Sequence, residues 1–336
     1  MSNAITDATT DIVTDALLIE VVGVTKYFPV ASGMLFSRSS ASVKAIDGVS
    51  FAIREGEAIG LVGESGCGKT TMARLVLRLE EPTSGEIRFR GKALTALSRS
   101  EIGSYRGAVQ AVFQDPQSSL SPRMRIGDII AEPLVVAGTH TAAQVRERVA
   151  QVLEWVELDP KAERLYPHEF SGGQRQRIAV ARALAIEARL VVLDEPVASL
   201  DASVRSQIVN LLKDLQQRLG LSYLLISHDL AASRHLCHRI AVMYLGRMVE
   251  IAPCDDLFDD PLHPYTKALL SAALPAHPDA VRDEVILTGE IPSPIAPPSG
   301  CRFHTRCPVA MPHCSTRDPV LREIAPNRHV ACHLFD

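Results

Sequence analysis

A glycine-rich segment that ends in lysine and threonine is the first group of residues able to do recognisable chemistry. It reads Gly63-Glu-Ser-Gly-Cys-Gly-Lys69-Thr70 and fits the pattern G-x-x-x-x-G-K-[ST]. Glycines let backbone N–H groups wrap a phosphate, the next helix directs its positive end at it, and Lys69 adds a mobile charge. We therefore predict a phosphate-binding loop at residues 63–70, here called the P-loop, in which Thr70 offers its hydroxyl to Mg²⁺.

The flanking sequence supports this prediction. An apolar run at Ala58–Val62 is typical of a strand, and Thr71–Leu79 has a helical pattern, so strand, loop and helix follow in the required order. The alternative is a glycine-rich turn with an incidental lysine, which this context disfavours. The predicted nucleotide contacts here are Gly63, Glu64, Ser65, Gly66, Cys67, Gly68, Lys69, Thr70 and Thr71.

Two adjacent carboxylates end a second apolar run, Leu190-Val-Val-Leu-Asp194-Glu195. In this arrangement Asp194 can hold hydrated Mg²⁺ while Glu195 polarises an attacking water. Acidic pairs commonly end strands, so the pair alone is a weak signal. Together with the P-loop it predicts hydrolysis of a bound nucleotide.

The segment Phe170-Ser171-Gly172-Gly173-Gln174 resembles the signature motif of the ABC (ATP-binding cassette) ATPases. In that family two ATPase domains pack head to tail, and the signature of one closes over the ATP held by the P-loop of the other. The resemblance implies that Ser171, Gly172, Gly173 and Gln174 contact a partner's nucleotide, through N–H groups that open a helix. Without this context the segment would equally suit a plain helix cap.

Other single residues match the family at the expected order and spacing. Gln114 matches the Q-loop glutamine, which links the Mg²⁺ site to the membrane partner, Asp201 matches the D-loop, and His228 matches the switch histidine at the γ-phosphate. Phe28 lies where the family places an aromatic ring on adenine, with Tyr27 or a plain core role as alternatives. The resemblance thus makes Glu195, His228 and Gln114 catalytic, and Thr70, Gln114 and Asp194 the residues at Mg²⁺.

The elements that must position these residues begin with strand-like runs separated by turns. They are Leu18–Val24, Val49–Ile53, Ala58–Val62 and Glu86–Phe89. Later runs are apolar throughout, as in strands covered on both faces, at Leu190–Leu193, Tyr223–Ile226 and Ile240–Tyr244. Their alternation with helices predicts a parallel α/β sheet.

A helical insert is predicted from Asp115 to about Glu169. Apolar residues recur at helical spacing from Gln144 to Val156, Gly138–Thr141 supplies a helix start, and Pro122 and Pro133 interrupt the approach. The family resemblance implies that this insert receives a coupling helix of a membrane permease. Alternatively it serves only the ATPase core, as in soluble ABC proteins.

The predicted fold class is α/β, a P-loop NTPase of the ABC cassette type. By resemblance it has a RecA-like parallel-sheet core, an antiparallel β subdomain and a helical subdomain at about 115–185. We expect a disordered leader at 1–16, the nucleotide-binding domain at 17–255 with a surface loop at Val30–Ser42, and a C-terminal region at 256–336 that follows the importer type. A proline-rich segment at Ile291–Gly300 precedes the cysteine-rich end.

Four of the seven cysteines, Cys301, Cys307, Cys314 and Cys332, lie near the C-terminus. Four soft ligands suit a [4Fe-4S] cluster or tetrahedral Zn²⁺, and the absence of tight C-x₂₋₄-C pairs disfavours structural zinc. The importer ATPases that this tail resembles carry an iron–sulfur cluster, so a structural [4Fe-4S] cluster is expected. The nearby His304, His313, His329 and His333 are expected to be solvated.

Several stretches resemble the second of the two paired ATPases of oligopeptide and dipeptide importers. They are Gln114-Asp-Pro-Gln-Ser-Ser-Leu120, Ser121-Pro-Arg-Met124, Tyr166-Pro-His-Glu-Phe170, Leu262-His-Pro-Tyr-Thr-Lys-Ala268, Pro292-Ser-Pro294, Pro297-Pro-Ser-Gly-Cys301 and Thr305-Arg-Cys-Pro308. The resemblance implies an ATPase peripheral to the cytoplasmic face of the membrane. Its partners would be a second homologous ATPase, two permeases and an extracytoplasmic peptide-binding protein. Alternatives are another solute, such as nickel or glutathione, or a soluble ABC ATPase without a transport role.

Composition argues against other classes. The 336 residues carry 35 basic and 39 acidic side chains, a net charge of −4, so no nucleic-acid partner is expected. No stretch approaches the roughly 20 apolar residues of a membrane-spanning helix. The N-terminal residues lack the basic start and apolar middle of a secretion signal.

Overall fold

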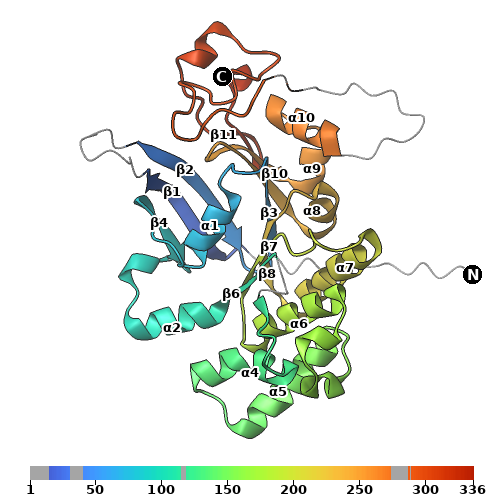
Figure 1. The fold of residues 1–336 in the computed structure, drawn as a ribbon. Helices are drawn as coiled ribbons and strands as arrows, with labels where there is room; N and C mark the ends of the chain where they lie inside the picture. Colours follow the sequence, from blue (N-terminus) through green and yellow to red (C-terminus); the bar gives the residue numbers. More distant parts are fainter. Residues whose placement is uncertain (1–14, 31–40, 115–118, 274–286, 288) are drawn as a thin grey trace, which may run out of the picture.

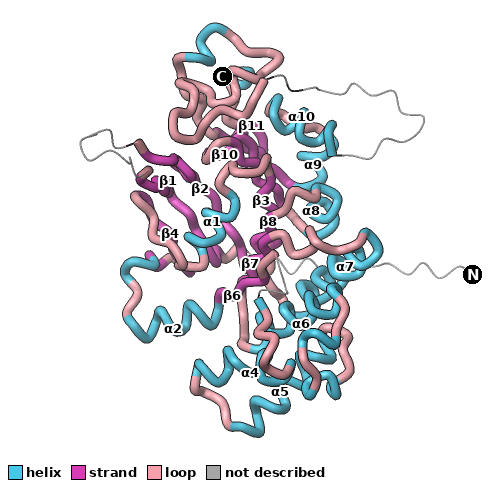
Figure 2. Tube along the Cα trace, viewed as in Figure 1, coloured by secondary structure: helices cyan, strands magenta, loops and turns pink. Residues whose placement is uncertain are grey.

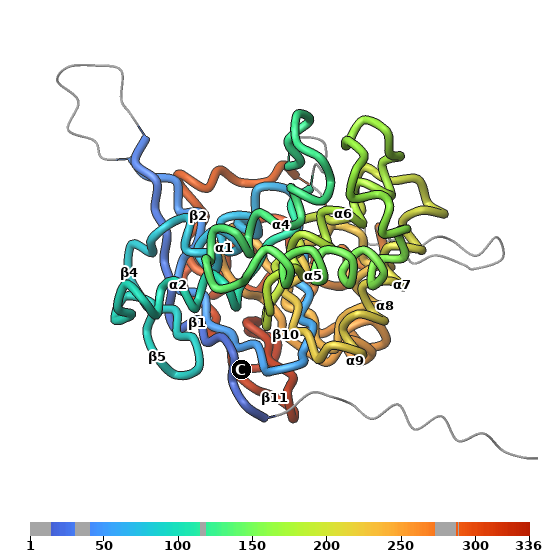
Figure 3. Tube along the Cα trace, turned by 90° about the horizontal axis from the view of Figure 1, so that it is seen from below, coloured from blue at the N-terminus to red at the C-terminus, as the bar shows by residue number. Residues whose placement is uncertain are grey.

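The computed structural model describes residues 15–30, 41–114, 119–273, 287 and 289–336. Two sheets form its centre, with an antiparallel sheet on one side of α1 (Lys69–Val76) and the helices that follow the core strands on the other. Figure 3, seen from below, shows the same division. Most of the predicted leader (residues 1–14) and most of the predicted loop at Val30–Ser42 lie outside the described residues.

The first sheet has four antiparallel strands in the order β2-β1-β4-β5. They are β1 (Leu17–Pro29), β2 (Ser42–Arg54), β4 (Ser84–Phe89) and β5 (Lys92–Ala93). The strands predicted at Leu18–Val24 and Val49–Ile53 are present, but β1 and β2 run on into polar sequence. Their polar ends stay paired because Thr25 lies opposite Asp47 and Lys26 opposite Ile46. The length of these strands is therefore set by backbone pairing, which the pattern of apolar and polar side chains does not indicate.

The second sheet holds the predicted parallel core. The strands β6 (Val109–Val112), β7 (Leu190–Asp194), β8 (Ser222–Ile226), β3 (Ala58–Val62) and β9 (Arg239–Tyr244) are neighbours in that order and all parallel. Every residue of β3, β7 and β8 is buried, which explains their uninterrupted apolar sequence. The α/β prediction is confirmed.

Helices connect and cover these strands. They are α2 (Arg99–Ala108), α7 (Ala202–Leu219), α8 (Leu230–Leu236), α9 (Cys254–Asp259) and α10 (Pro264–Ala273). The helix after the P-loop begins at Lys69 and ends at Val76, before the predicted Leu79. It stops because Arg78 takes a left-handed conformation with φ 55°. Among the described residues, no helix is long and apolar enough to span a membrane.

The helical subdomain consists of α4 (Ile126–Ala137), α5 (Ala142–Trp155) and α6 (Gly172–Ala185), and Figure 2 shows it as the helix-rich end of the molecule. The start predicted for α5 is confirmed, since Thr141 forms a capping box with Gln144. Pro133 was expected to interrupt the approach to α5 and instead lies inside α4. Buried Ile129, Ile130 and Leu134 fix α4 in place despite the lost backbone hydrogen bond.

The C-terminal region extends the core sheet. The strands β10 (Arg247–Pro253), β12 (Arg328–Val330) and β11 (Arg322–Ala325) continue it antiparallel from β9. Buried Glu250 of β10 accepts the N–H groups of Leu262 and His263, each at 2.9 Å, and so anchors the approach to α10. The cysteine-rich end is therefore continuous with the cassette.

Candidate functional site

The P-loop joins β3 to α1 and is shaped by glycines. Gly63, Gly66 and Gly68 have φ values of 149°, 79° and 113°, a region that favours glycine. A Cβ at Gly63 would lie 2.2 Å from the carbonyl oxygen of Met243, and one at Gly68 would lie 2.4 Å from that of Ala45. Only glycine fits these two positions, and the backbone is thereby left free to approach a phosphate.

Lys69 supplies the positive charge at this loop. Its side chain is 7% exposed, and its Nζ donates to the carbonyl oxygens of Gly63 at 2.7 Å and Glu64 at 3.0 Å. These neutral acceptors hold the ammonium group at the loop without neutralising it. A phosphate oxygen could replace them with a charge-assisted bond.

A cavity of about 300 Å³ lies against the P-loop, lined by Phe28, Val43, Ala45, Ser65, Gly66, Gly68, Lys69, Thr70, Thr71, Glu195 and Pro294. It lies where the parallel strands end, the edge at which open α/β sheets bind ligands. Phe28 lines the cavity, whereas the Tyr27 hydroxyl donates to Asp47. This geometry favours Phe28 over Tyr27 for stacking on a base.

Pro294 in this cavity was not predicted. Its carbonyl accepts the N–H of Lys44 in β2 at 3.0 Å, which holds the proline-rich segment against the cavity. The composition of that segment indicated only a break between regions. Nothing in its sequence pointed to a contact with β2, because that contact exists only in the folded chain.

Glu195 is held between two of the other predicted site residues. Gln114 Nε2 donates to Glu195 Oε2 at 3.1 Å, and His228 Nδ1 lies 3.2 Å from Glu195 Oε1. The three residues follow the neighbouring strands β6, β7 and β8, whose register pairs Val112 with Leu193 and Asp194 with Ile226. Parallel pairing therefore brings together residues from three distant parts of the sequence.

Asp194, at the end of β7, is suited to a bound cation. Burial and the neighbouring Glu195 raise the pKa of Asp194, while Arg74 and Lys69 act in the opposite direction. A cation near both carboxylates would relieve this repulsion and favour the ionised form. Carboxylate, hydroxyl and amide oxygens are the hard donors that Mg²⁺ prefers, so Asp194, Thr70 and Gln114 fit the expected ion chemically.

The signature residues lie apart from this cavity. Ser171 caps α6, accepts the N–H of Gln174 and forms a capping box with it. Ser171, Gly172 and Gln174 are exposed, and none of them lines the cavity at the P-loop. Asp201 is likewise exposed, at the start of α7. These residues are thus exposed to solvent and lie outside the lining of the cavity at this chain's own P-loop.

The four C-terminal cysteines are free thiols that influence one another. Burial, followed by the charges of Cys314, Cys332 and Cys307, raises the pKa of Cys301 to about 11. No three histidine, cysteine or acidic side chains among the described residues are close enough together to hold a metal ion. The expectation that all four nearby histidines are solvated is wrong for His333, which is buried and lies 2.7 Å from Asp336.

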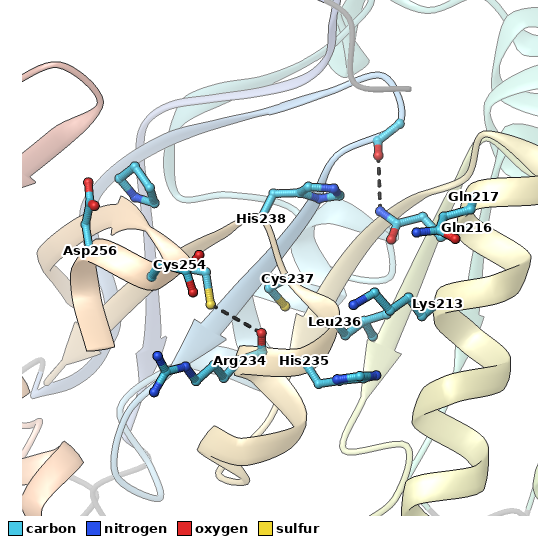
Figure 4. Close-up of a pocket in the computed structure, with 13 residues that line it drawn as sticks. Lys213, Gln216, Gln217, Arg234, His235, Leu236, Cys237, His238, Cys254 and Asp256 are labelled. Atoms are coloured by element: carbon cyan, nitrogen blue, oxygen red, sulfur yellow. Dashed lines mark hydrogen bonds between the residues drawn. The ribbon is translucent and has the colours of Figure 1, made fainter. Parts of the chain in front are cut away.

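A larger cavity of about 740 Å³ lies at the opposite edge of the sheet, where the parallel strands begin (Figure 4). Side chains of α7, α8 and α9 surround it. Several are already bonded, since Gln216 donates to the Gly56 carbonyl at 3.1 Å and the Cys254 thiol contacts the Arg234 carbonyl at 3.6 Å. None of the predicted site residues lines this cavity.

Comparison with known proteins gives matches along most of the chain. The ABC transporter family matches residues 46–198, and the oligopeptide/dipeptide transporter C-terminal region matches residues 249–314. The oligopeptide transport ATP-binding protein AppF of Bacillus subtilis is 48% identical over 321 residues, which cover 95% of this chain and 97% of that protein. A putative peptide import ATP-binding protein of Brucella ovis is 52% identical, with coverage of 95% and 98%.

Solved structures share the cassette. The dimeric, post-hydrolysis ATP-binding cassette MJ0796 bound to ADP and Pi is 28% identical with a TM-score of 0.61, covering 70% of this chain and 99% of that one. The cbiO1 subunit of a Clostridium perfringens ABC transporter is 26% identical with a TM-score of 0.63, with coverage of 73% and 92%. Both likenesses support the cassette fold.

The substitution Glu195→Gln tests the site directly. We expect it to retain nucleotide binding but to lower phosphate release by about 100-fold or more, because the amide is no longer a base toward water. Binding of a fluorescent ATP analogue and phosphate release at saturating Mg-ATP would be measured on the same preparation. Near-normal turnover would show that Glu195 does not activate the attacking water.

Proposed function

The chain belongs to the ATP-binding subunits of oligopeptide/dipeptide ABC transporters, and we propose that it hydrolyses ATP to energise the import of di- or oligopeptides. The observation that carries the proposal is Glu195, held between Gln114 and His228 at the cavity beside the P-loop. The C-terminal match to the peptide transporter region supports the class of cargo.

The assigned roles follow from placement. The P-loop backbone and Lys69 bind the phosphates of ATP, and Phe28 stacks on the base. The Glu195 carboxylate takes the proton of the attacking water, while Gln114 and His228 keep its oxygens directed at the γ-phosphate. Asp194, Thr70 and Gln114 hold Mg²⁺, which neutralises charge on the phosphates when bound.

A second ATPase is required in this proposal. The exposed Ser171, Gly172 and Gln174 open α6 away from the chain's own cavity, so they can cover a nucleotide only on another subunit. We propose a homologous ATPase of the same transporter as that partner, in a heterodimer. ATP would close the pair, and hydrolysis would reopen it.

The membrane-facing contact is assigned to the helical subdomain. Val135 and Val136 at the end of α4 are 66% and 81% exposed, and Phe113 beside Gln114 is 44% exposed. These apolar side chains suit contact with a coupling helix of a membrane permease. The extracytoplasmic peptide-binding protein and the position at the cytoplasmic face are proposed from family membership.

We further propose that Cys301, Cys307, Cys314 and Cys332 hold a [4Fe-4S] cluster. Four free thiols that influence one another electrostatically offer soft ligands of the type such a cluster takes, and in a four-iron cluster each would bind a different iron. A single tetrahedral ion would need them closer, with Zn–S bonds of about 2.3 Å. The cluster would serve as a structural link in a region with little core of its own.

Metal analysis of the anaerobically purified chain tests this assignment. We expect about four irons and four sulfides per chain, with a broad visible absorption that Cys307→Ser diminishes, because that substitution removes one ligand. Cys237→Ser, which changes a buried cysteine of the cassette, is the matched control. Zinc at about one ion per chain would support the alternative, and no metal in either form would reject both.

The transport role is tested by what accompanies the chain in detergent-solubilised native membranes. We expect mass spectrometry to identify a second ATPase, two permeases and a binding protein, whose bound solute reports the cargo. A binding protein for nickel or glutathione would support a role in import but would contradict peptides as the imported solute. Recovery with ribosomes or nucleic acid, without a permease, would contradict the transport proposal.

A further inference from the structure

The loop between the first two C-terminal cysteines, residues 301–307, contacts the P-loop. Arg306 forms a two-pronged ion pair with Glu64, the second residue of the P-loop, through Nη1 at 2.8 Å and Nη2 at 3.1 Å. The Arg306 side chain is 7% exposed and that of Glu64 is 23% exposed. Bonds of this geometry hold their partners in a defined orientation.

Glu64 itself is turned away from the nucleotide cavity. Its backbone N–H donates to the Tyr265 hydroxyl at 2.8 Å, and its side chain is not among those that line the cavity. Neither the N–H nor the side chain of Glu64 therefore supports the prediction that Glu64 contacts the nucleotide, which stays a prediction. Its carboxylate and N–H hold the P-loop to the C-terminal region, and its carbonyl accepts from Lys69.

Aromatic packing fixes Arg306 in place. Phe303 of the same loop is 1% exposed and lies against the rings of Tyr244 and Tyr265, with ring centres 5.3 and 5.4 Å apart. Arg306 also lies over the Tyr244 ring at 5.9 Å. The loop is thus anchored in the core at the end of β9, and the guanidinium has little freedom to leave Glu64.

A second arginine of this loop reaches the P-loop indirectly. Arg302 donates to the Leu245 carbonyl and pairs with Asp47. The adjoining Gly246 donates its N–H to the carbonyl of Cys67 in the P-loop at 2.8 Å. Arg302 therefore braces the β9–β10 turn on which the P-loop rests.

The same network extends to the strand that carries Phe28. Asp47 accepts the Tyr27 hydroxyl, and its N–H donates to the Gly246 carbonyl at 2.9 Å. Burial opposes ionisation of Asp47, but the bond from Tyr27 and the charges of Arg302 and Arg247 hold its pKa below the ordinary value. An ionised Asp47 thus joins the C-terminal loop to the base-binding side of the cavity.

We propose that Arg306 is a positioning residue for the P-loop, and that the C-terminal region sets the affinity of the site for nucleotide through the Arg306–Glu64 pair. This rests on the proposed ATP site but goes beyond the residues assigned to it. Arg306 touches neither nucleotide nor water in this proposal; it acts by fixing the backbone that binds the phosphates. Its loss should therefore raise the KM for ATP and leave kcat at saturating ATP largely unchanged.

The test measures Mg-ADP affinity of the full chain by titration calorimetry, and KM and kcat for ATP in the assembled transporter. We expect Arg306→Met to raise both the Kd for Mg-ADP and the KM for ATP by about tenfold, equivalent to 1.4 kcal/mol. Glu64→Gln should raise both constants by a similar factor. The double variant should be no weaker than either single one, because both substitutions remove the same interaction.

Arg322→Met is the matched control. Arg322 also belongs to the C-terminal region, but it lies in the edge strand β11 and pairs with Asp336 at 2.7 Å within that region. We expect it to keep wild-type Kd and KM. Arg306→Lys retains the charge without the two-pronged geometry and should restore part of the affinity lost in Arg306→Met.

Each outcome decides between distinct conclusions. Wild-type affinity in Arg306→Met, additive losses in the double variant, or an equal loss in Arg322→Met would overturn the proposal. Thermal unfolding will show whether Arg306→Met folds. If it does not, Arg306→Lys, Glu64→Gln and their combination replace it, and additive losses of affinity in the combination would again overturn the proposal. Failure of the wild-type chain to bind Mg-ADP would instead reject the proposed ATP site.

Discussion

The close approach of the P-loop to its neighbours is the constraint on which the nucleotide site depends. Added Cβ atoms at Gly63 and Gly68 would overlap the backbone oxygens of Met243 and Ala45, so β9 and β2 touch the loop directly. A loop packed this tightly takes its shape from those strands. Protein interiors are closely packed, so a displacement of either strand would move the phosphate-binding N–H groups.

The C-terminal region acts on the same strands. It extends the core sheet through β12 and β11 and places Pro294 in the cavity wall. It also directs Arg306 to Glu64 of the P-loop and Arg302 to the β9–β10 turn that contacts the loop. A region that looks like an appendage in sequence is thus part of the frame of the ATP site.

The two halves of the catalytic apparatus face different directions. The carboxyl ends of β6, β7 and β8 bring Gln114 and His228 to Glu195, which lines this chain's own cavity, whereas the signature residues at the start of α6 are exposed to solvent. In the proposed function, this chain binds the nucleotide and activates water, while a second ATPase closes over the nucleotide. That proposal would couple hydrolysis to the relative position of two subunits.

Contiguous motifs made much of the site predictable. The P-loop, the Asp194-Glu195 pair and the buried strands β3, β7 and β8 each have a local sequence pattern, because loop shape and two-sided burial restrict every residue in turn. The family resemblance singled out Gln114 and His228 separately, and parallel pairing of the strands accounts for their contacts with Glu195. Helix α4 lies within the predicted helical insert, but its bounds were not predicted, because Pro133 disfavours a helix interior and packing overrides that preference.

The sequence by itself determined which residues can bind phosphate and activate water, since those capacities lie in side-chain chemistry and short-range backbone freedom. Tertiary structure alone decided that Phe28 rather than Tyr27 lines the cavity, that Pro294 joins it, and that Glu64 turns to Arg306. Glu64 and Arg306 are 242 positions apart, and no local pattern links them. Such pairs form only when the sheet brings distant segments to one edge. A charged side chain that is buried there needs a partner of opposite charge.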